Sequence, residues 1–151
     1  MADVLLPLAL LYADRSRQIE GATRFQKLAF LTQKEGDIGE RHEFKADKYG
    51  PFSPTLAGAL KTLETKGYLQ RDIRTTQKGN EEYIYSLTNK GRRAIQNLRQ
   101  DEERDIDSIL DAAQQIKQSN NNVPLDRLLR YVYKKFPEYT SESELDLADE
   151  I

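Results

Sequence analysis

The residues whose chemistry most clearly suggests a function are cations grouped around one short segment. Arg71, Arg74 and Lys78 lie on or beside a predicted β-hairpin. Three further cations begin the helix predicted after it: Lys90, Arg92 and Arg93. A basic hairpin beside a helix entry suits the phosphate backbone of a nucleic acid, because each neutralised phosphate releases counterions. The alternative is solubilising charge on an exposed hairpin, since three acids are scattered nearby: Asp72, Glu81 and Glu82.

The helix predicted over residues 54–66 supplies a second set of candidate contacts. Leu56, Leu60 and Leu63 mark its buried side, by the helical period of about 100° per residue. The opposite side carries small or hydroxyl residues and one lysine: Thr55, Gly58, Lys61, Thr62 and Thr65. Such a face can approach a DNA groove, but it holds no Arg, Asn or Gln for bidentate base recognition. We therefore expect contacts to phosphates and to DNA shape, or else an ordinary solvated face.

The segment before this helix adds two cations and a distinctive string. Arg24 and Lys27, on a helix predicted over residues 22–34, complete the DNA-binding candidates. The string Tyr-Gly-Pro-Phe-Ser-Pro at residues 49–54 predicts a turn followed by a capped helix start. We expect Tyr49 and Phe52 to pack beneath that helix rather than to bind a ligand.

Catalytic and metal-binding chemistry has little support. The chain has no Cys and one His, which excludes disulfides, thiolate zinc sites and cysteine nucleophiles. His42 has no nucleophile or metal-ligand spacing beside it, so we interpret it as a surface or packing residue. The acids of residues 101–111 lack the loop geometry of calcium motifs, and phosphate-loop signatures are absent. We expect no enzymatic activity and no cofactor.

The remaining pattern predicts how these residues are positioned. A first helix begins near Leu6, because Pro7 is tolerated only in a first turn, and residues 19–21 form a connector. Residues 40–52 are extended or loop. Residues 68–74 and 83–87 read as strands around a Gly79-Asn80 turn. Thr88 caps a long helix reaching about Gln118, and a last helix covers residues 124–136.

The order helix, helix, helix, hairpin, helix is that of a winged helix-turn-helix protein, in which the third helix can enter a DNA groove. The fold class is therefore mainly α with a small β-hairpin (α+β), followed by a long helix and a short one. Residues 59–71 and the Leu-Thr-x-x-Gly turn of residues 85–91 resemble MarR-like and PadR-like regulators. That resemblance implies a DNA-binding third helix and a wing over residues 70–82.

A second resemblance covers residues 5–88. The string TRFQKLAFL at residues 23–31, followed by FKADKYGPFS at residues 44–53, is similar to the YwgA-type family and, more distantly, to the SocA-type antitoxin domain. Those prokaryotic proteins have a helix-turn-helix-like core. One departure from a plain helix-turn-helix is the linker: about 17 residues separate the second and third helices, against the usual turn of about 3–4.

We divide the chain into a winged-helix domain (residues 1–91), a C-terminal helical extension (residues 92–136) and an acidic tail (residues 137–151). The extension has more apolar surface than a small core can cover. Its residues could pair with a second chain, giving a homodimer, or fold back on the first helix. The dimerisation candidates are Ile106, Ile109, Leu110, Ile116, Leu128, Leu129 and Val132.

Charge and composition set the wider limits. Residues 1–100 hold 17 Lys and Arg against 12 Asp and Glu, whereas residues 101–151 hold 6 against 13, so the front half favours an anionic partner. The longest apolar run is too short to span a bilayer, and the N-terminus lacks the basic start of a signal peptide, so we expect a cytoplasmic protein without membrane contact. The acidic tail could compete with DNA or only aid solubility.

These observations favour a dimeric winged-helix protein that binds double-stranded DNA, as a prokaryotic transcriptional regulator. The alternative is a protein-interaction module, antitoxin-like or an adaptor, on the same scaffold without DNA binding. The long linker and the near-neutral net charge of −2 favour that alternative.

Overall fold

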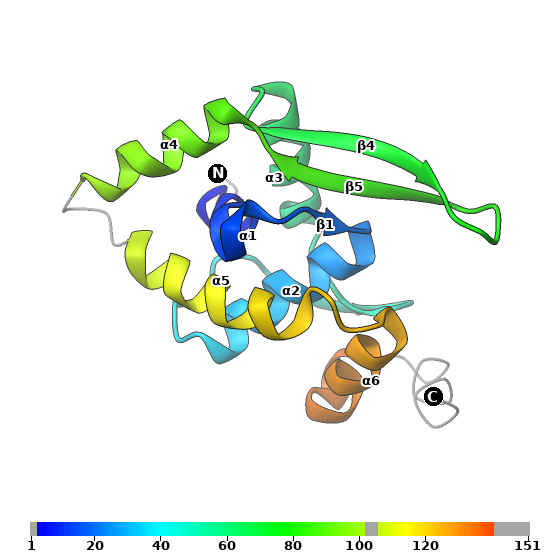
Figure 1. Cartoon of the computed structure of the whole chain (residues 1–151). Coiled ribbons are helices and arrows are strands. Elements are labelled where there is room, and N and C mark those ends of the chain that lie inside the picture. The colour runs from blue at the N-terminus through cyan, green and yellow to red at the C-terminus, as the bar shows by residue number, and fades with distance from the viewer. Residues whose placement is uncertain (1–2, 102–105, 141–151) are drawn as a thin grey trace.

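The computed structural model describes residues 3–101 and 106–140. The described chain has a mixed α+β fold with a β-hairpin, as the sequence predicts (Figure 1). The helices and strands in chain order are α1 (Leu5–Ser16), β1 (Ile19–Glu20), α2 (Ala22–Glu35), β2 (Lys45–Asp47), β3 (Gly50–Phe52), α3 (Pro54–Thr65), β4 (Leu69–Thr75), β5 (Glu81–Leu87), α4 (Asn89–Arg99), α5 (Ile106–Asn120) and α6 (Leu125–Lys135), before a short 3-10 turn (Pro137–Tyr139).

The main sheet is antiparallel, with strand order β1-β5-β4. Strands β4 and β5 pair from Leu69–Leu87 at the base to Thr75–Glu81 near the turn, and their hairpin projects away from the helices (Figure 1). The predicted connector at residues 19–21 contains β1, which pairs Ile19 with Tyr85 on β5. The main sheet thus consists of the β4–β5 hairpin with the short strand β1 along β5.

Helices α3 and α4 begin at the capping residues that the sequence predicts. The Ser53 hydroxyl accepts a hydrogen bond from the Leu56 amide at 3.1 Å, and the Thr88 hydroxyl accepts one from the Gly91 amide at 3.1 Å. Gly67 follows α3 with φ +80°, a left-handed conformation that favours glycine. The chain therefore reverses into β4 within a few residues of the end of α3.

The long linker between α2 and α3 is a second small hairpin, β2–β3, anchored by two buried side chains of α2. The Gln26 amide donates to the Ser53 carbonyl at 3.0 Å and accepts from the Ser53 amide at 2.9 Å. The Lys27 Nζ donates to the Pro51 carbonyl at 2.9 Å. Tyr49 does not pack beneath α3: it is 47% exposed, because the β2–β3 turn points it into solvent.

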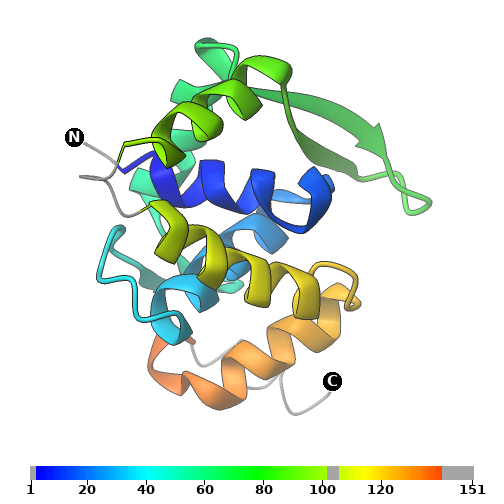
Figure 2. The ribbon, with the colours of Figure 1, turned by 60° about the vertical axis from the view of Figure 1, so that its left-hand side comes forward.

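The hydrophobic core is centred on α1, which is buried around nearly its whole circumference. Its Leu6, Leu10 and Leu11 are fully buried, and α5 lies along it (Figure 2). A helix that is apolar around its whole circumference must be buried by neighbouring elements on every side, and α5 packs against one side of α1. Within the described residues, no helix combines the length and the apolar character that crossing a bilayer requires.

The helix predicted from Thr88 to about Gln118 is two helices. Helix α4 ends at Arg99 and α5 begins at Ile106, running back along the molecule (Figure 1). A single helix of this length would extend roughly 45 Å and carry the apolar residues Ile109 and Ile116 beyond the core. The change of direction instead lays those side chains against α1.

The proposed dimerisation residues lie inside the chain's own core. All seven are buried: Ile106, Ile109, Leu110, Ile116, Leu128, Leu129 and Val132. Helix α5 packs on α1, and α6 packs on α2. Of the two alternatives for the C-terminal extension, the structure therefore adopts the fold-back, and these side chains are not exposed for pairing with a second chain.

Helix α1 ends in an unusual left-handed turn. Asp14, Arg15 and Ser16 have φ of 53°, 59° and 56°, which costs energy for residues other than glycine and needs support from the surroundings. The Asp14 amide donates to Gln114 on α5 at 2.6 Å, and Arg92 on α4 donates to the Ser16 hydroxyl at 3.0 Å. The turn is thus held by both C-terminal helices.

Lys117 completes this support from inside the core. Its fully buried Nζ donates to the carbonyls of Ala13 at 2.7 Å and Leu11 at 3.3 Å, at the C-terminal end of α1. Burial lowers the pKa of Lys117 to about 7, although the nearby carboxylate of Asp14 raises it and Arg17 lowers it further. The ammonium form is therefore disfavoured in the folded state relative to the unfolded chain.

Because the pKa of Lys117 is lowered in the folded state, we predict that the free energy of unfolding depends on pH. The folded pKa lies below the unfolded one, so the unfolded chain binds more protons between about pH 7 and pH 10.5. We expect the free energy of unfolding to rise with pH across this window, by up to about 1.4 kcal/mol per pH unit. Urea denaturation of the wild type and of Lys117→Met measures this, since the variant lacks the titration. Equal pH slopes for the two proteins would contradict the assignment.

The Gln26 contacts predict a large loss of stability. Gln26→Leu leaves the buried amide of Ser53 without a partner, which costs about 1–3 kcal/mol. The Ser53 carbonyl loses its bond from Gln26 but still accepts from the Ala57 amide at 3.2 Å. The free energy of unfolding, measured by chemical denaturation, is expected to fall accordingly. Gln118→Leu makes the same chemical change on an exposed helix position and is expected to change it by less than about 0.5 kcal/mol. A similar small effect at both positions would show that Gln26 does not anchor the linker.

Candidate nucleic-acid interface

The predicted cations of the β4–β5 hairpin are largely neutralised by neighbouring acids. Arg74 contacts Glu20 on β1 at 3.1 Å and Glu82 on β5 at 2.8 Å. Hydrogen bonds to Glu82 and then to Glu20 raise the pKa of Arg74. Both terminal nitrogens of Arg74 are therefore paired within the chain. Exposed pairs of this kind add little stability, but they remove positive charge from the wing.

The other hairpin cations differ in their surroundings. Arg71 lies 3.4 Å from Glu64 on α3 and stacks over the Tyr83 ring at 4.5 Å from its centroid. Lys78 is exposed at the hairpin turn. The three acids of the hairpin balance its three cations, so the wing as a whole carries no net charge.

The two α2 candidates are directed into the molecule. Lys27 is only 2% exposed and binds the Pro51 carbonyl. Arg24 is half-buried and donates to the Asn120 carbonyl at 3.1 Å; its burial lowers its pKa, while Glu20 and Glu82 raise it. The structure therefore does not gather all the predicted cations on one exposed face. It brings Lys27, Lys61 and Arg71 together around one cavity, with Lys27 buried.

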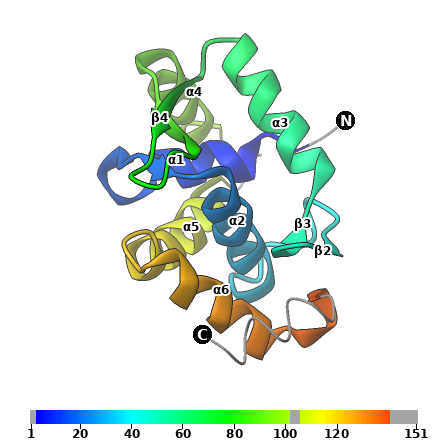
Figure 3. The ribbon, with the colours of Figure 1, turned by 90° about the vertical axis from the view of Figure 1, so that its right-hand side faces the viewer.

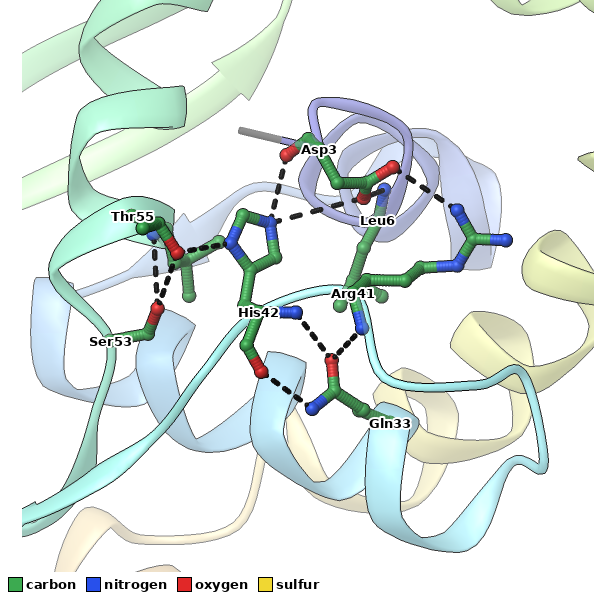
Figure 4. Close-up of polar contacts among 8 residues, drawn as sticks. Asp3, Leu6, Gln33, Arg41, His42, Ser53 and Thr55 are labelled. Carbon is green, nitrogen blue, oxygen red and sulfur yellow. Dashed lines mark hydrogen bonds and ion pairs between the residues drawn. The ribbon is translucent and has the colours of Figure 1, made fainter. Parts of the chain in front are cut away.

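Thr55 is an exposed residue, but its hydroxyl belongs to a hydrogen-bond network within the chain (Figure 4). Its hydroxyl lies 2.8 Å from His42 Nδ1 and 3.0 Å from the Ser53 hydroxyl. His42 Nε2 lies 2.8 Å from the Asp3 carbonyl, so this nitrogen carries the proton and Nδ1 accepts from Thr55. Gln33 binds the backbone of His42 through both its amide atoms.

This row of hydroxyl, imidazole and acid has the residue types of a nucleophile, a base and its orienting group. However, the imidazole ring is fully buried, with 0% of its side chain exposed, and both ring nitrogens are occupied. A general base must reach the proton that it abstracts from a substrate. The network therefore ties the N-terminus to the start of α3, and His42 is a packing residue.

Figure 3 shows how α3 and α4 are arranged around the base of the β4–β5 hairpin. A different group of basic residues lies where α3 ends and α4 begins. The pairing of Leu69 with Leu87 places the residues before and after the β4–β5 hairpin side by side. Lys90 Nζ accordingly donates to the Lys66 carbonyl at 2.7 Å. A Cβ at Gly91 would collide with the Tyr68 carbonyl oxygen, so glycine permits this close approach.

We call this region the α3–α4 surface. Its exposed residues are Lys61, Thr62, Thr65, Lys66, Lys90 and Arg93. Lys61, Thr62 and Thr65 were expected from the sequence. Lys66 was not among the candidates, although the predicted helix included it; in the structure it is the C-cap of α3. The signal that could have found it is the short reversal at Gly67, which forces both ends of the hairpin together. The α4 sequence contains no acidic residue at all.

No candidate metal site is found among the residues that the structure describes. Among residues 3–101 and 106–140, no three or more His, Asp or Glu side chains are grouped so that they could hold a metal ion.

The His42 network predicts acid sensitivity. Burial lowers the pKa of His42 below 6.5, although the Asp3 carbonyl raises it, so the ring is neutral in the folded state. Its contribution to stability is therefore present above pH 6.5 and is lost as the pH falls through the lower, folded pKa. Between pH 6.5 and 5, thermal unfolding should show a steeper loss for the wild type than for His42→Gln. This is the chain's one histidine, so identical pH profiles would count against the network.

Comparisons with known proteins identify no relative, so a function can be assigned only from the fold and from this surface. The resemblances to winged-helix regulators and to the YwgA-type and SocA-type proteins thus rest on the motifs quoted above. No protein-family model matches the chain, and no curated protein has a significantly similar sequence.

Proposed function

We propose that this protein binds double-stranded DNA through the α3–α4 surface, as a winged-helix transcriptional regulator. The observation that carries the proposal is the exposed group of four cations, Lys61, Lys66, Lys90 and Arg93, on α3, its C-cap and the start of α4. The acid of α3, Glu64, lies 3.4 Å from Arg71. Cations on one exposed face are what the phosphate backbone requires.

The composition of the surface favours backbone contacts over base recognition. Thr62 and Thr65 are small enough for the α3 backbone to approach a groove, and their hydroxyls can donate to phosphates. The surface offers no Asn or Gln and one Arg for bidentate contacts to base edges. Binding is therefore expected to depend strongly on salt and weakly on sequence.

Fluorescence anisotropy with a labelled duplex of mixed sequence tests the proposal. Between 50 and 200 mM salt, the affinity of the wild type should fall steeply, with a slope of about −0.9 for each phosphate contacted. Lys66→Glu with Arg93→Glu should weaken binding by more than about tenfold and lower the slope. Neither side chain forms an ion pair within the described residues, so the fold should persist.

The matched control is Lys45→Glu with Lys134→Glu, on β2 and α6. It changes the net charge equally but lies away from the α3–α4 surface. DNA affinity near the wild-type value in the control, with a loss in the first variant, supports the surface. Equal losses in both would show only a general charge effect, and an absence of salt-sensitive binding by the wild type would overturn the proposal.

A protein-interaction module is the second candidate, and one observation favours it. Strand β4 is an edge of the sheet, and its Ile73 is 59% exposed. The open backbone groups of such an edge can pair with a strand of a partner, with the isoleucine as an apolar contact. A partner that binds the wild type stoichiometrically and is lost with Ile73→Asp, without any DNA affinity, would favour this function.

A further inference from the structure

A cavity of about 530 Å³ lies between α2, the β2–β3 hairpin, α3 and the base of β4–β5. Its apolar wall comes from separate elements, with Leu60 and Ala57 on α3, Phe52 on β3 and Tyr85 on β5. Small-molecule sites in proteins have volumes of about 300–1,000 Å³ and a mainly apolar lining with few polar groups. The cavity has the size and the construction of such a site.

The charged groups around the cavity are predominantly positive. Four cations line it: Lys27, Lys48, Lys61 and Arg71. Two acids line it as well, Asp47 and Glu64, and the latter lies 3.4 Å from Arg71. The excess of cations on an apolar wall favours a ligand that joins an apolar group to an anionic one.

Tyr85 adds a polar group that the fold itself does not use. This side chain is 5% exposed, and its ring packs edge-on against Phe25, yet its hydroxyl forms no hydrogen bond within the described residues. Burial raises the pKa of Tyr85, while the nearby charge of Arg71 lowers it. The Tyr85 hydroxyl is therefore neutral and lies near Arg71. In this position it could donate a hydrogen bond to an oxygen atom of a ligand.

One wall of the cavity is held by hydrogen bonds to the backbone before α3. Gln26 and Lys27 both line it, and the same two side chains hold the backbone at Ser53 and Pro51. A pre-formed site binds without the cost of ordering loops around its ligand.

We propose that this cavity binds a small amphipathic anion, with an aromatic or branched apolar group against Leu60 and Ala57 and a carboxylate or sulfonate beside Arg71 and the Tyr85 hydroxyl. This site is separate from the DNA contacts proposed above, except that Lys61 borders both.

The test uses two fluorescent naphthalene dyes and the full-length protein. The anionic probe is 8-anilinonaphthalene-1-sulfonate, and the neutral probe is N-phenyl-1-naphthylamine, which has the same ring system without the sulfonate. We expect saturable binding of the anion at one site, and binding of the neutral dye that is weaker by about tenfold, the value of a charged hydrogen bond. Equal affinities for the two dyes would overturn the proposed charge recognition.

Two variants locate the site. Ala57→Trp fills the cavity and should abolish binding of the anion, whereas Thr62→Trp, on the outer side of α3, should leave it unchanged. Arg71→Gln should weaken the anion about tenfold and leave the neutral dye unaffected. Circular dichroism of each variant checks that the fold is retained.

The outcomes separate this proposal from the DNA proposal. Unchanged anion binding by both folded variants, Ala57→Trp and Arg71→Gln, would place the dye elsewhere and refute the site. Neither residue belongs to the α3–α4 surface, so a failure of DNA binding leaves this test intact. Binding that is abolished in Ala57→Trp, weakened in Arg71→Gln and kept in Thr62→Trp supports the cavity as the site.

Discussion

The attachment of α2 to the backbone just before α3 is the constraint on which the positions of the functional elements depend. A linker of this length between two helices would leave α3 many possible orientations. Gln26 removes that freedom by holding both backbone groups of Ser53, the residue that caps α3, and Lys27 holds Pro51. These contacts set where α3 begins, and they also form one wall of the cavity.

The pairing of β1 with β5 determines the electrostatics of the wing. It brings Glu20, from a segment far away in the chain, next to Arg74 and Glu82. Positive charge that looks available along the chain is therefore neutralised within the sheet. At the other end of the hairpin, Lys66 and Lys90 meet without a neighbouring acid of this kind, which is why the proposed DNA contacts lie there.

Local signals in the sequence predicted most of the helices and the hairpin, because capping and reversal depend on neighbouring residues. Ser53, Thr88 and Gly67 are examples, and each has the predicted role. Strand β1 could not be predicted, since two residues carry no periodicity and pair only through the tertiary fold. The break after Arg99 was hidden because the apolar spacing of α4 continues into α5.

The candidate site was less predictable than the fold, since charge along a sequence says nothing about tertiary partners. The lysine at position 27 could be assigned to α2, but not to the buried side of that helix, because a buried ammonium needs an acceptor that only the folded linker supplies. Similarly, the threonine at position 55 has the outward helical position expected of it, yet its hydroxyl bonds to an imidazole brought there by the linker.

The central position of α1 has a consequence for how the chain is made. This helix is synthesised before α5, which packs along it and follows roughly 100 residues later. At about 5–20 residues per second, the side of α1 that faces α5 stays without that contact for about 5–20 s on the ribosome. The final burial of α1 therefore waits for the synthesis of α5, and until then the nascent chain exposes that apolar side.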